Sequence, residues 1–235
     1  MPGGATRKTW ASGKVVLRTG DALTLRRERL AMSAAARALP VPRVLEAVEF
    51  SDDAGRPAAA LLLSRLPGRP AGNCAGLSME EARRRGEVCG RLHDLLEGVA
   101  PPGGLAPLQG LPAAVRSSGP SLLHLDLHPL NVLIDDAGEV TGVLDWANTA
   151  AGPAVLDRAR TWSILALDPA AVRLREEPRF AALSEGWTRA AAFEHLPAAA
   201  RAWACQKMLD DLAPRYPGHR LGHVRQRLIE IESSM

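Results

Sequence analysis

The sequence predicts an α+β protein in which a small β-rich part precedes a larger helical part. Three observations lead to this prediction. Short β-branched and aliphatic runs lie in the first third of the 235 residues, the last third is rich in Ala, Leu and Arg and is interrupted by prolines, and a hairpin pattern lies between them. With 46% hydrophobic residues, the chain has enough apolar surface to bury a core.

The first part is predicted to be a sheet with one helix. A strand is expected over residues 14–18, and a helical pattern follows over 23–39, where the Pro-Val-Pro of residues 40–42 ends it. Residues 44–50 and 58–63 are predicted strands joined by a turn. Because only thirteen residues precede the first of these strands, we expect any strand before it to be missing or short.

Residues 66–70 carry two prolines and one glycine, which interrupt regular structure. We expect a boundary here between a small β-rich lobe over residues 1–66 and a larger helical lobe over 67–235.

The second part is predicted to be mainly helical. A helix is expected over residues 78–96, because Ser78 is a good N-cap and acidic residues fill the first turn. Residues 98–120 are rich in Pro and Gly and predict a loop. From residue 169 onward, proline-separated Ala- and Leu-rich segments predict a series of helices.

The charge of the chain is uneven. Residues 1–70 carry twelve Lys or Arg against six Asp or Glu, whereas residues 71–235 carry seventeen against twenty. This balance suits an anionic ligand near the N-terminal part. Nucleic acid is not an expected partner, since the arginines are dispersed, aromatic residues make up 4% of the chain, and no nucleic-acid-binding motif is present.

Other classes of protein are also disfavoured. No run approaches the roughly 18 apolar residues that a membrane span needs, and the first residues lack the apolar core of a secretory signal. The three cysteines are far apart, so neither a disulfide framework nor a zinc knuckle is expected. We therefore expect a cytoplasmic protein with no membrane partner, and the oligomeric state stays open.

The hairpin pattern carries the candidate chemistry. Residues 131–134 and 140–144 have the composition of strands, and four turn residues join them. Folding at this turn brings Asn131 and Asp145 to the same end of the hairpin, and Asp126 lies five residues before Asn131. Three oxygen-bearing side chains are thus predicted to converge.

These three side chains suit phosphoryl transfer. The spacing H-x-D-x-x-x-x-N followed by an Asp predicts that Asp126 accepts the proton of a hydroxyl group, while Asn131 and Asp145 hold Mg²⁺ on the phosphates. An alternative is that His124, Asp126 and His128 are metal ligands on one face of a strand, as in a metallohydrolase. The kinase-like spacing fits the sequence better, and we expect both histidines to be structural.

The run His124-Leu-Asp126-Leu-His128-Pro-Leu-Asn131, followed by Gly142-Val-Leu-Asp145-Trp146, resembles the aminoglycoside phosphotransferase family and its choline-kinase-like relatives. The resemblance extends over nearly the whole chain. It implies a two-lobed, protein-kinase-like fold with an abbreviated N-lobe. It also implies Mg²⁺ as cofactor, ATP or GTP as co-substrate, and a hydroxyl group of a small molecule as acceptor.

The resemblance also assigns a nucleotide site. Arg18 would contact the phosphates and pair with Glu28, and backbone groups of Ser64 and Leu66 would bind adenine. Gly4 and Thr6 would belong to the remnant of a loop that covers the phosphates.

On the acceptor side, the resemblance indicates Asp157, Asp210 and Asp211, which could bind a cationic or hydroxyl-rich molecule. Alternatively, these three are helix caps or surface charges. The family usually has Gly where this chain has Leu125 and Leu130, so we expect a reshaped acceptor side.

The acceptor itself stays open. It is an antibiotic such as an aminoglycoside or a macrolide, or a metabolite such as choline, homoserine or a sugar. A further alternative is a nucleotide-binding protein that has lost catalysis.

Overall fold

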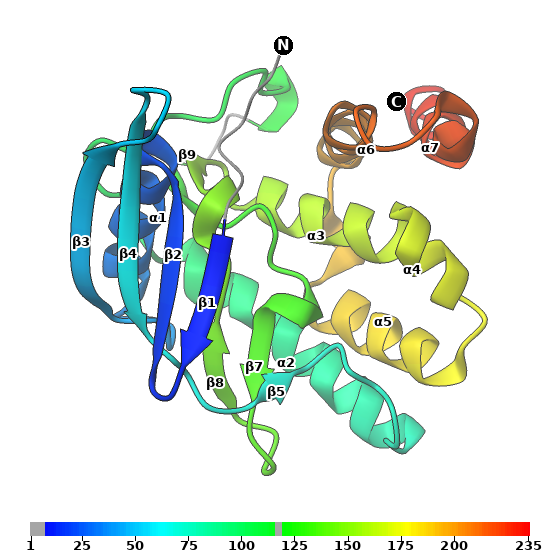
Figure 1. Cartoon of the computed structure of the whole chain (residues 1–235). Helices are drawn as coiled ribbons and strands as arrows, with labels where there is room; N and C mark the ends of the chain where they lie inside the picture. Colours follow the sequence, from blue (N-terminus) through cyan, green and yellow to red (C-terminus); the bar gives the residue numbers. More distant parts are fainter. Residues whose placement is uncertain (1–7, 116–118) are drawn as a thin grey trace.

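The computed structural model describes residues 8–115 and 119–235. A twisted antiparallel sheet and one helix form the first part, and a mainly helical assembly forms the second, with the sheet standing apart on one side (Figure 1). The predicted α+β class, with the sheet first and the helices last, is confirmed. Among these residues, no helix has the length and apolar composition that crossing a membrane requires.

The first sheet has the order β1-β2-β4-β3, in which β1 is Lys8–Ser12, β2 is Val15–Asp21, β3 is Val44–Ser51 and β4 is Pro57–Ser64. All neighbouring strands are antiparallel. A five-residue strand therefore does precede the predicted one, and it is short, as expected. Gly13 has a φ of +55° in the turn between β1 and β2, a conformation that suits glycine.

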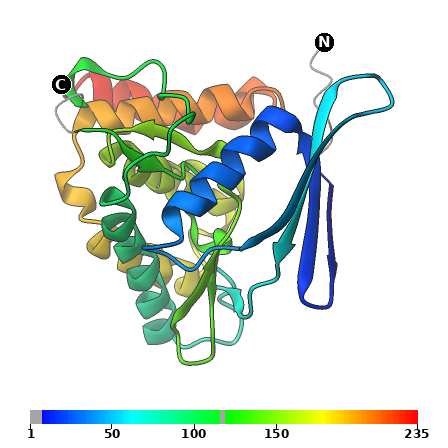
Figure 2. The same cartoon turned by 90° about the vertical axis from the view of Figure 1, so that its left-hand side faces the viewer.

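The helix α1 spans Ala22–Ala35 and packs against this sheet. Asp21 caps it, because its carboxylate accepts a hydrogen bond of 2.8 Å from the Thr24 amide. The helix ends a few residues before the predicted position, in a turn that precedes the prolines. Figure 2 shows α1 between the sheet and the helical part, so its buried side chains, Leu25 and Met32 among them, join the two parts.

The predicted hairpin is formed by β7 (Val132–Ile134) and β8 (Val140–Val143), and a two-residue strand β5 (Arg69–Pro70) extends it on the β7 side. Residues 65–70, called the linker below, dock on this hairpin. The Thr141 hydroxyl donates a hydrogen bond of 2.6 Å to the Pro67 carbonyl. Gly68 has a φ of +104°, and a Cβ there would lie 2.4 Å from Thr141 Oγ1, so only glycine fits.

Two short strands flank the hairpin in the sequence: β6 (Ser121–Leu123) precedes it and β9 (Ala150–Gly152) follows it. These two strands pair with each other. Single 3-10 turns occur at Ala113–Val115, Pro129–Asn131, Trp146–Asn148, Phe193–His195 and Gly218–Leu221. The predicted loop before β6 is confirmed for its described residues, apart from the first of these turns.

The remaining helices are α2 (Met79–Glu97), α3 (Val155–Leu167), α4 (Pro169–Leu174), α5 (Pro178–Ala190), α6 (Ala198–Leu212) and α7 (Gly222–Glu232). The prediction for α2 is confirmed, and Ser78 and Glu81 form a capping box at its start. Helices α2 and α5 touch at Gly86 and Gly186. A Cβ at Gly86 would overlap the Leu183 carbonyl oxygen, so the two glycines permit this close approach.

Candidate active site

Residues 124–131, called the catalytic loop below, leave β6 and lead into β7. Helix α3 runs beneath this loop and holds it through two side chains. Thr161 donates a hydrogen bond of 3.2 Å to the Leu127 carbonyl. Asp157 lies one helical turn earlier on the same face and bonds the beginning of the loop.

Asp157 is the anchor of the loop. Its Oδ1 accepts hydrogen bonds from the amides of His124 and Leu125 at 2.8 and 2.6 Å, and its Oδ2 lies 3.0 Å from Nδ1 of His93 on α2. Asp157 is 3% exposed, so its carboxylate faces no cleft. The expectation that Asp157 binds the acceptor is therefore wrong, because both of its carboxylate oxygens bond buried groups of this chain.

The carboxylate of Asp157 stays charged in this buried position. Burial by itself opposes ionisation, but the hydrogen bond from His93 and the hydrogen bond from the Leu125 amide outweigh it and hold the pKa of Asp157 below its ordinary value. A charge at this point strengthens the hydrogen bonds that fix the loop.

Leu125 adopts a left-handed conformation with a φ of 62°. This backbone region costs a residue with a side chain about 1–2 kcal/mol, and glycine adopts it freely. The hydrogen bond from the Leu125 amide to Asp157 and the burial of the Leu125 side chain hold the turn in place. Asp145 is also left-handed, with a φ of 58°, so both ends of the candidate site carry unusual backbone.

His124 is a structural residue, as expected. Its Nε2 donates to the Leu144 carbonyl at 2.9 Å, its Nδ1 accepts from the Asp126 amide at 3.2 Å, and its ring packs on Trp146 with centroids 4.6 Å apart. Because one ring nitrogen donates and the other accepts, the ring is neutral, and burial lowers its pKa. These bonds leave no ring nitrogen for a metal, which removes the metallohydrolase alternative.

The side chain of Asp126 is partly accessible to solvent, with 24% of its surface exposed. The Asn131 side-chain amide donates to the Asp126 carbonyl at 2.9 Å and approaches its carboxylate at 3.4 Å. His128 Nε2 lies 3.6 Å from the other carboxylate oxygen. Burial lowers the pKa of His128, so this ring is neutral near pH 7.

The hairpin brings Asn131 and Asp145 together as predicted, because the Leu144 amide donates to the Asn131 carbonyl at 2.8 Å. The side-chain amide nitrogen of Asn131 contacts Asp126 and His128. The side-chain oxygen Oδ1 of Asn131 has no partner among the described residues. The Asp145 side chain is 42% exposed, and Arg18 contacts only its Oδ1. Two open oxygens of this kind fit Mg²⁺, which takes few protein ligands and completes its shell with water and phosphate.

Within residues 8–115 and 119–235, no three His, Cys, Asp or Glu side chains cluster as a metal site on their own. The two-oxygen arrangement of Asn131 and Asp145 is therefore suited to a metal ion that arrives with phosphate groups, and it is not suited to a resident structural ion.

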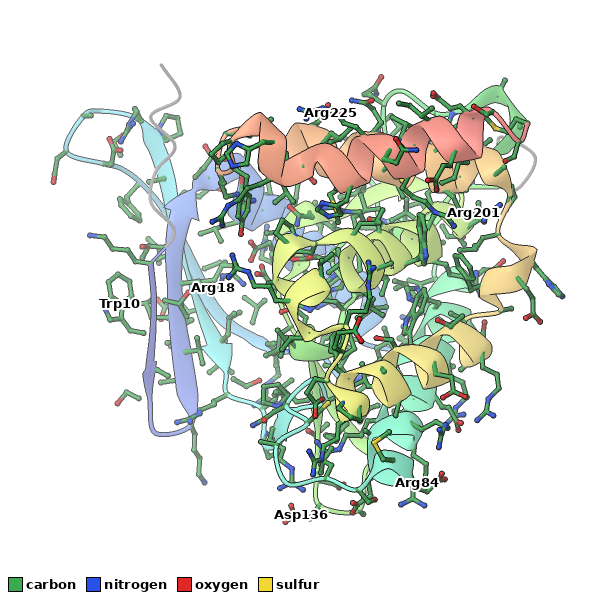
Figure 3. The ribbon with its side chains drawn as sticks, turned by 90° about the vertical axis from the view of Figure 1, so that its right-hand side faces the viewer. Trp10, Arg18, Arg84, Asp136, Arg201 and Arg225 are labelled. Atoms are coloured by element: carbon green, nitrogen blue, oxygen red, sulfur yellow. The ribbon has the colours of Figure 1, made fainter. Side chains whose placement is uncertain are left out.

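Arg18 spans the gap between the sheet and the hairpin. Its guanidinium lies 3.2 Å from Glu28 on α1 and 3.1 Å from Asp145, and it is 15% exposed. Figure 3 shows Arg18 on the side of the sheet that faces the helical part. The pairing of Arg18 with Glu28 was predicted, whereas the contact with Asp145 was not, because the sequence does not show how close β2 comes to the hairpin.

The predicted adenine contacts lie where β4 enters the linker. The Ser64 amide already donates to the Arg43 carbonyl at 2.8 Å, and the Ser64 hydroxyl accepts from the Arg43 amide at 2.8 Å. Of the two backbone groups of Ser64, the carbonyl is thus the one that could bind a ligand. Leu66 packs over Gly142, where an added Cβ would lie 2.6 Å from the Leu66 side chain. The other two predicted nucleotide residues, Gly4 and Thr6, lie outside the described residues.

A cavity of about 260 Å³ opens beside Asp126, between α3 and α6. We call it the polar cavity. Its lining consists of Asp126, His128, Asn148, Arg160, Ile164, Asp168, Met208, Asp211, Leu212 and Arg215. Asp211 is thus part of a lining next to Asp126, whereas Asp210 is exposed, bonds Gln206 at 2.8 Å and is not part of the lining, contrary to expectation. On α6, the helical repeat turns these two neighbours to different sides.

A second cavity of about 270 Å³ shares His128, Ile164 and Asp168 with the polar cavity, and the rest of its lining is mostly apolar. Leu130 contributes to it and is 56% exposed. Leu130 thus forms part of an apolar wall of this second cavity, while Leu125 points into the core.

Sequence analysis missed several residues of the site. Arg160, Asp168 and Arg215 line the polar cavity, and His93 supports Asp157. Arg160 could have been found, because it lies three residues after Asp157 and so projects from a neighbouring position on the same helix. Arg215 follows the end of α6 in an irregular segment, where no sequence period predicts its direction.

Comparison with known proteins gives the family and the fold of the chain. The model of the phosphotransferase enzyme family (APH) matches residues 6–111 and 103–193. No curated protein matches the chain.

Solved structures share the fold. The crystal structure of aminoglycoside phosphotransferase APH(4)-Ia has a TM-score of 0.66 at 16% identity, covering 97% of this chain and 93% of that one. The GDP and kanamycin complex of APH(2")-IIIa has a TM-score of 0.59 at 13% identity, covering 98% of this chain and 94% of that one. A thermostable mutant of APH(4)-Ia in complex with ADP and hygromycin B has a TM-score of 0.62 at 15% identity, covering 98% and 94%.

Proposed function

Because the chain belongs to the phosphotransferase enzyme family, we propose that it transfers the γ-phosphoryl group of ATP or GTP to a hydroxyl group of a small molecule. The observation that carries this proposal is the position of Asp126. Its carboxylate opens on the polar cavity, while its backbone carbonyl and carboxylate bond Asn131, next to Asp145. A proton acceptor for the hydroxyl and two oxygen ligands for a metal are thus parts of one rigid arrangement.

Asp126 orients the acceptor hydroxyl and takes its proton. The hydroxyl oxygen forms a bond to the γ-phosphorus, the bond from that phosphorus to the bridging oxygen breaks, and the nucleoside diphosphate leaves with the electron pair. Little covalent help is needed in such a loose transition state, so positioning and charge neutralisation supply most of the rate. The Asp157 anchor serves this positioning, because it fixes the loop that carries Asp126.

Asn131 and Asp145 would hold Mg²⁺, which neutralises charge on the phosphates. Arg18 would bind a phosphate as well, and Glu28 keeps its guanidinium in place. The Ser64 carbonyl and the Leu66 amide would contact the base. We assign this nucleotide-binding role to residues 1–66, with Gly4 and Thr6 near the phosphates, and the metal and acceptor roles to 67–235.

The acceptor of the similar structures is an aminoglycoside in the complexes with hygromycin B and kanamycin. At identities of 15% and 13% this likeness concerns the fold, so the acceptor of this chain is a separate question. An antibiotic such as an aminoglycoside or a macrolide, and a metabolite such as choline, homoserine or a sugar, are the candidate classes. The open carboxylate of Asp126 argues against a homologue without catalysis.

The test is release of nucleoside diphosphate by the full chain with Mg²⁺, ATP or GTP and a panel of hydroxyl compounds from these classes. The variant Asp126→Asn removes the proton acceptor and keeps the shape of the side chain. We expect turnover to fall by about 10²–10⁴-fold while nucleotide binding stays within a factor of about three. The matched control is Asp136→Asn, since Asp136 is an exposed carboxylate in the turn at the opposite end of the hairpin (Figure 3).

Wild-type turnover in Asp126→Asn would remove Asp126 from the mechanism. An equal loss in Asp136→Asn would show that the variants act through folding and not through the reaction. Absence of turnover in a wild-type protein that binds nucleotide with Mg²⁺ would favour the homologue without catalysis.

A further inference from the structure

The second cavity beside the catalytic loop, called the apolar cavity below, has a volume of about 270 Å³. His128 and Asp168 are the polar residues of its lining, and both also line the polar cavity. The rest of the lining comes from the catalytic loop, from α3, α4 and α5 and from Gly72, and it is apolar. Polar groups are thus confined to the edge that the two cavities share.

The apolar cavity has a buried end and an exposed rim. Leu183 is 1% exposed and belongs to a buried cluster with Ala82 and Ala182. Leu130 and Leu174, which also line the cavity, are 56% and 47% exposed. A hollow of this kind, apolar over most of its wall with a few polar groups at one edge, is the usual form of a small-molecule site.

Local contacts fix the position of Leu130 in the cavity wall. Its amide donates a hydrogen bond of 3.3 Å to Nδ1 of His128. Its side chain lies over Gly72, where an added Cβ would be 2.9 Å from Leu130 Cδ2. Glycine at position 72 therefore leaves room for this wall, and the shape of the cavity is set by specific contacts.

The apolar cavity adjoins the proposed proton acceptor. The His128 ring lines the cavity, and its Nε2 lies 3.6 Å from the carboxylate of Asp126. A group bound in the apolar cavity is thus separated from Asp126 by a single side chain. One molecule can therefore present a hydroxyl group to Asp126 and place another part of itself in the apolar cavity.

The size and lining of the cavity define the group that fits. A cavity of about 150 Å³ with aliphatic and aromatic walls binds benzene. At about 270 Å³, the apolar cavity has room for one substituted aromatic ring or a short alkyl chain. A polyhydroxylated or charged group would lose its bonds to water there and regain them at one edge alone, whereas a hydrocarbon group gains free energy by leaving water.

We propose that the apolar cavity is a subsite for the acceptor, and that the acceptor is an alcohol carrying an uncharged aryl or short alkyl group. This group binds in the apolar cavity while the hydroxyl reaches Asp126. The inference rests on the proposed function, because it names the class of acceptor for the same reaction. It favours such alcohols over aminoglycosides, choline and unmodified sugars. Leu130 and Leu174 are then specificity residues and take no part in the transfer itself.

The test uses pairs of alcohols that differ in the apolar group. Hexane-1,2-diol is compared with propane-1,2-diol, 3-phenylpropan-1-ol with propan-1-ol, and phenyl β-D-glucoside with methyl β-D-glucoside, and kanamycin serves as a polar acceptor. Nucleoside diphosphate release by the full chain measures turnover. Calorimetric titration with Mg²⁺ and a non-hydrolysable nucleotide measures binding.

We expect at least one alcohol with the larger apolar group to bind and react. Its kcat/KM should be at least about tenfold above that of its partner, since each buried methylene group raises affinity by about fourfold. The difference should lie mainly in KM, because the subsite binds substrate and transition state alike.

Variants of α4 then identify the cavity, with the ratio of kcat/KM within each pair as the readout. Leu174→Ser is expected to lower this ratio by about three- to tenfold. The matched control is Leu95→Ser, because Leu95 on α2 is 51% exposed and is not part of either cavity lining. Ala171→Phe places a ring in the cavity and should bring the ratio close to one.

Three results would overturn the proposal. One is equal kcat/KM for the two members of every pair, and another is a ratio that Leu174→Ser and Ala171→Phe both leave unchanged. The third is failure of every alcohol with the larger apolar group to bind to a protein that binds the nucleotide. If the nucleotide itself fails to bind, the proposed function fails, and the proposal for the acceptor falls with it.

Discussion

The two sides of the candidate site are built differently. The catalytic loop and Asp145 are fixed by buried groups, because Asp157, His124 and Trp146 together bond or pack on this backbone. The side where we propose that the nucleotide binds is held chiefly by more exposed contacts, namely the pairing of Arg18 with Glu28 and the bonds between Ser64 and Arg43. We call these regions the loop side and the sheet side.

This difference indicates that the two sides contribute to different quantities, the stability of the fold and the affinity for the nucleotide. On the loop side, the geometry that we propose for phosphoryl transfer is present without a ligand, so its residues contribute to the stability of the fold as well as to the proposed reaction. On the sheet side, Arg18 contacts Asp145 across the gap, and a bound nucleotide would compete for both side chains. Changes on the loop side should therefore alter stability, and changes on the sheet side should alter nucleotide affinity.

The largest effect is expected at the loop anchor. Asp157→Ala leaves the amides of His124 and Leu125 and one nitrogen of His93 without partners in the core. Each unsatisfied buried donor costs about 1–3 kcal/mol, so we expect the free energy of unfolding to fall by at least about 3 kcal/mol. Urea unfolding followed by circular dichroism measures this change.

Asp157→Asn is the matched variant, because its side-chain oxygen can still accept from both amides. We expect a loss of less than half that of Asp157→Ala, with a reduced kcat. If Asp157→Ala were as stable as the wild type, the loop side would not be held in the way described, and the comparison between the two sides would fail.

The linker joins the two sides, and Gly68 tests how tightly it is attached. In Gly68→Ala the new Cβ would lie 2.4 Å from Thr141 Oγ1 and 2.7 Å from the Ile134 carbonyl, at a φ of +104°. We expect a loss of about 2–3 kcal/mol in the free energy of unfolding. Gly76→Ala is the control, because its φ is +76° and nothing lies within 4 Å, so only the backbone penalty of about 1 kcal/mol applies. Equal losses in the two variants would mean that the linker is free to move away from the hairpin.

The pH dependence of stability tests the loop side in the wild-type protein, because two histidines of the catalytic loop titrate abnormally. Burial lowers the pKa of His124 and of His128 below the ordinary 6.5, so the folded state binds fewer protons than the unfolded chain once the pH falls below about 6.5. Stability should thus fall between pH 7 and pH 5, by at most about 1.4 kcal/mol per pH unit for each histidine. Asp157 adds nothing in this range, because its lowered pKa keeps it charged until the pH drops below its ordinary 3.8.

Urea unfolding at pH 7, 6 and 5 measures the slope, and His124→Gln should flatten it. Stability that stays constant or rises on acidification would show that the histidines of the catalytic loop are protonated in the folded protein.

The smallest effect is expected on the sheet side. Arg18→Lys keeps the charge but loses the planar guanidinium, which contacts both Glu28 and Asp145 through Nη2 and carries further donors that suit a phosphate. We expect nucleotide affinity to fall by about tenfold, or about 1.4 kcal/mol, with a change in unfolding free energy below about 1 kcal/mol. Calorimetric titration and thermal unfolding of the same sample give both numbers. A larger loss of stability than of affinity would reverse the assignment of this region.

The elements of the fold were largely predictable because their signals are local. The capping box at Ser78, the proline pair after α1 and the turn at the tip of the hairpin each depend on a few neighbouring residues. The convergence of Asn131 and Asp145 also follows from a single turn, which is why the loop side could be read from the sequence.

The rest depends on contacts between distant elements. Asp157 reaches the catalytic loop over 32 and 33 residues, and Arg18 reaches Asp145 over 127. A buried Asp on a helix face and an Asp at the edge of a cavity have the same local sequence signal, so Asp157 and Asp211 were assigned the same role although only Asp211 lines the cavity. The burial that distinguishes them is a property of the packed structure.

The measurement that tests the central claim most directly is calorimetric titration of ATP and GTP into the full chain with and without Mg²⁺, for the wild type and for Asp145→Asn. Our account predicts that at least one nucleotide binds, that Mg²⁺ tightens this binding, and that Asp145→Asn loses about tenfold or more of the Mg²⁺-dependent affinity while its thermal unfolding is unchanged. Binding that is indifferent to both Mg²⁺ and Asp145, or absence of binding by either nucleotide, would contradict it.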